Sequence, residues 1–147
     1  MLSKKSQYAL YALMHLAREY QKGPVLISTI AKEEKLPQKF LETILLEAKK
    51  LGVCSSKKGK GGGYYLTTPP EKINLAFVIR GFEGAIALLP CAALVHYESC
   101  TQCKDEDICG IRGVFKELRD ATEAYLRNVS LADVIKKENN LILLLRK

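Results

Sequence analysis

Four of the five cysteines of this chain lie in one short, polar stretch. Cys91, Cys100, Cys103 and Cys109 are accompanied there by the charged run from Lys104 to Asp107. Cysteine is usually a small buried hydrophobe, so a charged setting favours ligand or redox chemistry over packing. Four thiolates can hold a tetrahedral zinc ion or an iron–sulfur cluster.

The cysteine spacing leaves more than one chemistry open. Only Cys100 and Cys103 are separated by two residues, whereas zinc sites usually contain two such pairs. A dithiol that oxidises to a disulfide is the other alternative. His96 lies in the same stretch, but four cysteines already complete a ligand set. Cys54 lies far from the others, and we expect it to pack in the core.

A second constellation combines lysine with glycine. Between two predicted strands, residues 53–56 and 64–67, the chain carries Lys57, Lys58 and Lys60 among Gly59, Gly61, Gly62 and Gly63. A phosphate-binding nucleotide loop would lie between a strand and a helix and end in Lys-Ser or Lys-Thr, and this segment does neither. A solvated hairpin without function is one interpretation. A basic hairpin that follows a helix is also typical of the wing of a DNA-binding winged helix.

The charge distribution favours the second interpretation. Residues 1–67 contain 12 Lys or Arg and 5 Asp or Glu, whereas residues 68–147 contain 11 of each, so the formal net charge of +7 lies entirely in the first half. Lysine and arginine supply most non-specific affinity for DNA phosphates. An anionic membrane would also attract this charge, but no basic amphipathic helix exposes bulky apolar residues, so we expect no membrane partner.

Hydrophobic periodicity predicts the elements that position these groups. Apolar residues at helical spacing predict helices over about residues 9–20, 27–31, 37–51 and 73–82. Ser28 or a neighbour is available to cap the second helix, Pro37 suits the first turn of the third, and Gly52 suits its end. Two helices joined by a tight turn form a helix-turn-helix, so we predict a mainly α fold in which residues 1–82 are a winged helix-turn-helix domain with a small β-hairpin wing.

The second half is predicted to hold a partner surface. After the cysteine-rich sensor loop, residues 83–109, apolar residues recur at helical spacing from Gly110 in a helix of about five turns. Because helix-turn-helix proteins usually bind two half-sites as symmetric dimers, we expect a long dimerisation helix. Its predicted interface residues are Ile111, Val114, Phe115, Leu118 and Tyr125. Ser130 can cap a short final helix that ends at Lys137, and residues 138–147 are expected to form a tail.

Composition limits the class of protein. At 147 residues and 48% hydrophobic content, one globular core is expected. No apolar run approaches membrane-spanning length, the N-terminal segment does not resemble a signal peptide, and an odd number of cysteines argues against a disulfide framework, so a cytoplasmic location is expected. His15 lies among the apolar positions of the first helix, where we expect a core or interface role. No nucleophile and base, or pair of carboxylates, forms a recognisable catalytic arrangement, so catalysis is not predicted.

Five segments of the chain share their order and spacing with one protein family: SKKSQYALYALMHLA, IAKEEKLPQKFLETIL, KKGKGGGYYL, PPEKINLAFVIRGFEG and CGIRGVFKELRDATEAYLRNVSLADVI. Together with the cysteine loop, they make the chain resemble, over nearly its whole length, the winged-helix regulators typified by IscR, NsrR and CymR. The resemblance implies a homodimeric transcription regulator, usually a repressor, that binds an inverted-repeat operator in double-stranded DNA. It further implies that a cluster or small signal controls DNA affinity.

The resemblance also implies roles for particular residues. Residues around the Phe40-Leu41-Glu42-Thr43 motif would contact base edges. Lys58 stands where the family usually has arginine, and lysine keeps the positive charge but lacks the planar bidentate fork. The predicted DNA-binding residues are Gln38, Lys39, Glu42, Thr43, Lys57, Lys58, Lys60 and Tyr64.

For the cofactor, the resemblance implies a [2Fe–2S] or [4Fe–4S] cluster held in the cysteine loop. Cys91 and Cys109 match the outer family positions, and either Cys100 or Cys103 matches the middle one. Cluster-bearing members commonly have three cysteines and a non-cysteine fourth ligand, whereas this chain has four cysteines. A zinc-stabilised regulator, a regulator without a cluster, and a winged-helix module that binds proteins remain the alternatives.

Overall fold

The protein is mainly helical, as predicted, and the computed structural model describes residues 1–147. The helices and strands occur in the order α1 (Lys4–Arg18), α2 (Ile27–Glu33), α3 (Gln38–Lys50), β1 (Cys54–Lys57), β2 (Gly63–Leu66), α4 (Leu75–Glu83), α5 (Gly110–Arg127) and α6 (Leu131–Leu145), with short 3-10 helices η1 (Pro70–Lys72) and η2 (Pro90–Ala92). None of the helices is both long enough and apolar enough to cross a membrane.

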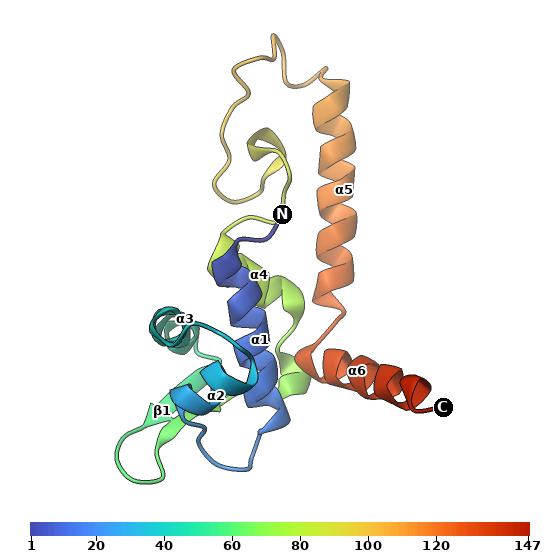
Figure 1. Cartoon of the computed structure of the whole chain (residues 1–147). Helices are drawn as coiled ribbons and strands as arrows, with labels where there is room; N and C mark the ends of the chain where they lie inside the picture. The colour runs from blue at the N-terminus through green and yellow to red at the C-terminus, as the bar shows by residue number, and fades with distance from the viewer.

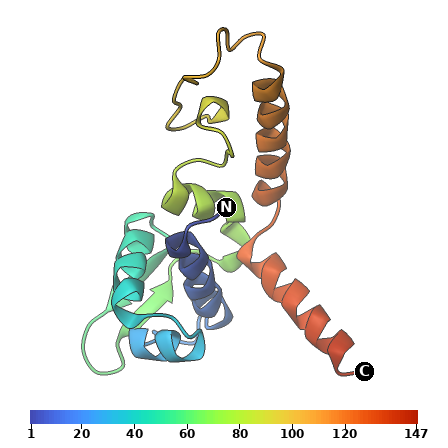
Figure 2. The ribbon, with the colours of Figure 1, turned by 45° about the horizontal axis from the view of Figure 1, so that its top comes forward.

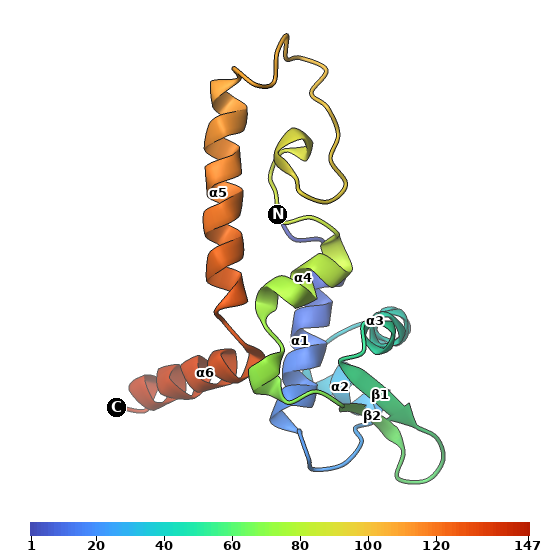
Figure 3. The same ribbon diagram turned by 180° about the vertical axis from the view of Figure 1, so that it is seen from behind.

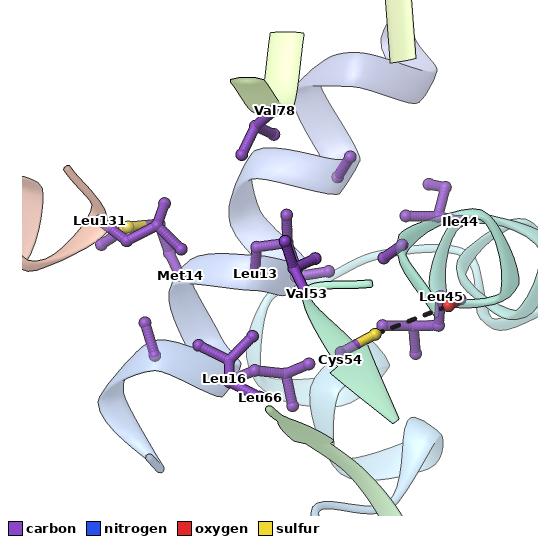
Figure 4. Packing of buried hydrophobic residues seen from close by; sticks show 14 of the residues in the cluster. Leu13, Met14, Leu16, Ile44, Leu45, Val53, Cys54, Leu66, Val78 and Leu131 are labelled. Carbon is purple, nitrogen blue, oxygen red and sulfur yellow. Dashed lines mark hydrogen bonds between the residues drawn. The ribbon is translucent and has the colours of Figure 1, made fainter. Parts of the chain in front are cut away.

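Helix α1 is the centre of the hydrophobic core, around which α2, α3, the hairpin, α4 and the start of α6 are arranged (Figures 1 and 3). Leu13 and Leu16 of α1 are almost completely buried among Ile44 and Leu45 of α3 and residues from the other elements (Figure 4). Apolar residues at helical spacing therefore bury one face of α3 and leave its other face exposed.

Two expected caps differ from the structure. The residue before α2 is Leu26, whose side chain makes no capping hydrogen bond, and Ser28 lies inside the helix. Pro37 is the residue immediately before α3 rather than part of its first turn. Its extended backbone, with ψ of 119°, still sets the chain direction into α3. The predicted helices are thus correct in place, and their limits differ from the expected ones by a few residues.

The two strands form the predicted antiparallel hairpin, each displaced by one residue from its expected limits. In its register, Cys54 pairs with Leu66 and Lys57 with Gly63. Tyr64 also exchanges two backbone hydrogen bonds of 2.8 Å with Val25, which ties the hairpin to the segment before α2. Gly63 permits this close approach because its φ is +140° and an added Cβ would lie 2.3 Å from the Val25 carbonyl oxygen.

Helix α5 stands beside the cysteine loop and away from the hairpin, so the loop and the wing lie at opposite ends of the molecule (Figures 1 and 3). The helix is held to α4 by an ion pair from Arg80 to the buried Glu123, which also pairs with Arg127 one turn further along α5. Burial alone would raise the pKa of Glu123, but hydrogen bonds from both arginines bring that pKa below its usual value.

Helix α6 corrects the prediction of a short helix followed by a tail. It begins with the expected Ser130, which forms a reciprocal capping box with Asp133, but it continues to Leu145 instead of ending at Lys137. Residues 138–145 contain no glycine or proline and are rich in leucine, a strong helix former, so nothing stops the helix. Its second half projects away from the domain (Figure 2).

The start of α6 is bonded to the start of α4 through the backbone. The Leu75 amide donates to the Val129 carbonyl and the Leu131 amide donates to the Ile73 carbonyl, both at 2.9 Å. Leu131 is fully buried in the main core. The base of α6 therefore belongs to the helix-turn-helix body, and the turn between α5 and α6 is where α5 leaves it.

Candidate DNA-binding surface and cysteine pocket

The exposed face of α3 carries the side chains that were predicted to contact bases. Gln38, Lys39, Glu42 and Thr43 are all exposed, while Leu41 between them is 1% exposed and faces the core. The opposite side of the helix is positioned on α1 by an edge-to-face contact between Phe40 and Tyr8, with ring centroids 5.7 Å apart, and by an ion pair of 3.2 Å between Glu47 and Lys5.

The wing presents only positive charge. Lys57, Lys58 and Lys60 are exposed and take part in no ion pair, so their charges are available to phosphates. The wing loop depends on its glycines, since a Cβ on Gly62 would lie 2.2 Å from the Lys57 carbonyl oxygen.

Helix α3 and the wing meet at one open hollow of about 400 Å³. Among its lining residues are Gln38 of α3, Lys57 and Lys58 of the wing, and Tyr64 of β2. Burial raises the pKa of Tyr64, with smaller contributions from Cys54 and Glu42, so its hydroxyl remains a neutral donor. The structure thus brings four of the predicted DNA-binding residues to one surface, with Lys39, Glu42 and Thr43 exposed on α3 and Lys60 at the wing tip.

The same hollow contains two serines that sequence reasoning missed. Ser28 is exposed at the start of α2, and Ser56 on β1 accepts a hydrogen bond of 2.9 Å from Lys49. Serine hydroxyls often bind phosphate oxygens beside a helix-turn-helix. The sequence offered little signal for them, because serine is common in turns and strands, and only the fold places both beside the wing.

The four loop cysteines line a second hollow, of about 680 Å³, between η2 and the N-terminal end of α5. Cys91 is 8% exposed, and Cys100, Cys103 and Cys109 are half-buried. No three cysteine, histidine or acidic side chains are close enough together to hold a metal ion in this arrangement. The donor set is nevertheless the one that an iron–sulfur cluster takes, because four thiols surround one cavity.

Two of these thiols, Cys103 and Cys109, lie close enough to shift each other's pKa. The Cys103 thiol donates to the Asp105 carbonyl oxygen at 3.1 Å, and Cys109 accepts from the Arg112 backbone N–H at 3.5 Å as the capping residue of α5. The hydrogen bond from Arg112 is the main reason that the pKa of Cys109 is lowered. Burial, followed by the contact with Cys109, raises the pKa of Cys103. Cys109 is therefore the thiol most easily deprotonated of this pair.

The remaining histidines and cysteine take no part in the cysteine pocket. His15 is 6% exposed and its Nδ1 atom lies 2.9 Å from a Glu34 carboxylate oxygen, which fits the predicted core role. Cys54 packs in the core, as predicted, and burial raises its pKa to about 11. His96 is exposed and lies beside Gly84 rather than in the pocket.

The apolar residues of α5 divide between two faces. Ile111, Val114, Leu118 and Tyr125 are 45–68% exposed, whereas the half-buried Phe115 points into an apolar groove of about 490 Å³ shared with α4 and the segment 85–88. Leu118 also lines this groove. Four of the five predicted dimer residues thus form an uncovered apolar stripe, and a stripe of this kind usually marks an interaction site.

Known proteins share both the sequence and the fold. Residues 2–137 match the family model Rrf2, described as an iron-dependent transcriptional regulator. An rrf2-like transcriptional regulator of the helix-turn-helix type from Rhodobacter capsulatus is 36% identical over 142 residues, covering 95% of each chain. The regulator IscR of Serratia proteamaculans is 25% identical over 141 residues, covering 96% of this chain and 82% of that protein.

Two solved structures agree with this assignment. The global cysteine regulator CymR of B. subtilis superposes with a TM-score of 0.76 at 26% identity, covering 93% of this chain and 97% of that one. IscR of T. potens gives a TM-score of 0.75 at 26% identity, covering 94% and 88%. The relatives are transcriptional regulators and not enzymes. The chain therefore belongs to the Rrf2 family of winged-helix, DNA-binding transcriptional regulators.

Proposed function

We propose that this protein is a homodimeric, cytoplasmic repressor whose affinity for its operator responds to an iron–sulfur cluster or to the redox state of the cysteine pocket. Residues 1–82 would bind DNA, residues 83–109 would sense the signal, and α5 would form the dimer. The observation that carries the DNA-binding part is the hollow in which Gln38 meets the unpaired lysines of the wing.

Dimerisation through α5 is supported by the exposed stripe on that helix. Two copies related by a twofold axis would present their α3 helices to successive major grooves on one side of the duplex. The operator would then be an inverted repeat with half-site centres roughly 34–36 Å apart. A charged substitution in the stripe should weaken dimerisation and operator binding together.

The sensor part is supported by the four cysteines around one pocket at the start of α5. When bound, an iron–sulfur cluster supplies a redox-active group whose loss or oxidation changes the set of thiolates that must be held together. Cys91, Cys103 and Cys109 would be ligands, with Cys100 as the fourth. Because the loop joins α4 of the DNA-binding domain to α5, its rearrangement would change the position of one helix against the other. Coupling of roughly 1–3 kcal/mol is usual between linked sites.

Anaerobic purification, iron and sulfide analysis and visible spectroscopy test the cofactor, while binding of the same protein to operator fragments tests DNA recognition. Cys91→Ala, Cys103→Ala and Cys109→Ala should abolish the visible chromophore. Cys54→Ala is the matched control, because Cys54 lies in the core of the DNA-binding domain.

Failure of reconstituted wild type to show a chromophore would reject the cluster, and one zinc per chain would then favour a zinc-stabilised regulator. Failure to bind any genomic fragment would favour a winged helix that binds proteins.

A further inference from the structure

Two charged residues, Arg112 and Glu106, hydrogen-bond to three of the four cysteines, through the backbone of Cys91 and Cys100 and the sulfur of Cys109. Arg112 lies in the first turn of α5, and its Nε atom donates to the Cys91 carbonyl oxygen at 2.9 Å. The Glu106 carboxylate accepts from the Cys100 amide at 2.9 Å. The third contact is the 3.5 Å hydrogen bond from the Arg112 amide to the Cys109 sulfur.

The same two residues are also bonded to each other. Arg112 Nε lies 3.6 Å from Glu106 Oε2, and Arg112 Nη1 donates to the Glu106 carbonyl oxygen at 3.4 Å. Glu106 accepts a further hydrogen bond from the Tyr97 hydroxyl. Both side chains are largely shielded from solvent, at 19% and 21% exposure, so these contacts are screened less than those of surface ion pairs.

The contacts connect three segments of the chain: the 3-10 helix η2, the loop around residue 100 and the N-terminal end of α5. A guanidinium suits this task because its several donors lie in one rigid plane, which an ammonium group does not provide. Arg119, two turns further along α5, donates a separate hydrogen bond to the carbonyl oxygen of Ala92. Loss of the Arg112 side chain would therefore free the backbone of Cys91. The Arg119 contact with Ala92 would still hold η2 to α5.

We propose that Arg112 and Glu106 are the positioning residues of the cysteine pocket, holding Cys91 and Cys100 against the N-terminal end of α5 so that all four thiols line one cavity. Neither residue is a ligand in this role. The fixed positive charge of Arg112 also offsets negative charge that thiolates bring into the pocket. The part of this inference that concerns a bound cluster rests on the proposed function, whereas the positioning of the cysteines concerns the chain alone.

The positioning role is tested on reduced protein without any cofactor, by measuring the alkylation rate of each cysteine with iodoacetamide and mass spectrometry. Arg112→Gln and Glu106→Ala should raise the rates at Cys91 and Cys100 by about tenfold, the effect of losing one charge-assisted hydrogen bond that opposes local opening. Arg112→Lys should restore only part of the protection. Lys116→Gln, one turn further along α5, is the matched control and should leave both rates unchanged.

Cys54 reports on folding in the same experiment, because it is 3% exposed in the core and stays protected in any folded variant. Glu106→Ala lies in the loop outside the core, so it provides a folded test if Arg112→Gln proves unstable. Unchanged alkylation at both Cys91 and Cys100 in a variant that keeps Cys54 protected would overturn the proposal.

Reconstitution with iron and sulfide gives a second measurement. Residues that orient ligands usually contribute roughly 10–100-fold to metal affinity, so the two variants should need correspondingly more iron and sulfide to reach half of the wild-type chromophore. Full reconstitution at the wild-type concentration would contradict the role in cofactor binding. If the wild type itself forms no chromophore, the proposed cluster fails, while the alkylation rates still decide whether Arg112 and Glu106 position the cysteines.

Discussion

Replacing the three wing lysines tests the DNA-binding surface most directly. Lys57, Lys58 and Lys60 are exposed and unpaired, so their removal to alanine should cost little stability and should mainly remove phosphate contacts. Each contact contributes roughly 0.9 to the slope of log affinity against log salt, so one wing would contribute about 2.7. In a dimer both wings bind, and the slope should fall by about 5.

The size of this effect makes the assay decisive. Between about 50 mM and 200 mM salt, a slope difference of 5 changes the ratio of wild-type to variant affinity by roughly a thousandfold. Fluorescence anisotropy with a labelled operator duplex, repeated at four salt concentrations, measures both slopes. A fall of about 2.7 instead of 5 would mean that only one wing contacts DNA at a time.

A matched control removes the same charge elsewhere. Lys136 and Lys137 on α6 and the terminal Lys147 are exposed and far from the wing in sequence. Their replacement by alanine lowers the net charge equally, so it should leave most of the salt slope intact. If both triple variants lose the same amount from the slope of log affinity against log salt, net charge governs binding. That result would refute a specific role of the wing lysines.

Three further changes test other parts of the molecule. Glu42→Ala should change preference among operator variants by roughly 1–3 kcal/mol at one base pair, and equal losses on all sequences, measured by competition binding, would contradict a direct base contact. Tyr125→Asp should convert the dimer to a folded monomer in sedimentation velocity, because this side chain is 65% exposed in one chain and is not part of its core; a dimer that persists at micromolar concentration would exclude Tyr125 from the dimer interface. Glu123→Gln should lower the free energy of unfolding near neutral pH by about 1–3 kcal/mol, because Arg80 and Arg127 lose a charged acceptor. Since the pKa of Glu123 is lowered in the fold, this stabilisation is complete above its unfolded pKa of about 4.3 and is lost as pH falls through the folded value, so denaturant titrations of the two proteins should converge in acid.

The sequence predicted those parts of the fold that depend on local pattern. Ile44 and Leu45 lie at helical spacing with Leu41, and the structure buries all three. The end of α6 was predicted wrongly because the polar residues Glu138 to Asn140 resemble a boundary. In the structure Glu138 is instead a partner of Arg18 at 2.9 Å, which supports the helix across the point where the pattern weakens.

The candidate sites were predictable to different depths. A cysteine can bind a metal and a lysine can bind a phosphate wherever the fold places them. Both the cysteine loop and the lysine-rich wing could therefore be recognised from the sequence. Arg112 and Glu106 were not singled out, because isolated charges on a helix or in a loop usually face solvent. Their significance comes from contacts with Cys91, 21 residues away from Arg112, and with Cys100, six residues away from Glu106, and only the folded loop creates those contacts.

The attachment of α5 gives the molecule the mechanics of a lever. Its C-terminal end meets the helix-turn-helix body where Val129 and Leu131 bond to the start of α4, and its other end carries Cys109. An 18-residue helix is about 27 Å long, so a displacement of about 2.5 Å at the cysteine end corresponds to a rotation of only about 5° at this fulcrum. In a symmetric dimer, the rotations at the two α5 helices would add, and their sum would change the distance between the two α3 helices. Small chemical rearrangements at the cysteine end of α5 would thus change the half-site spacing that the dimer prefers in its operator.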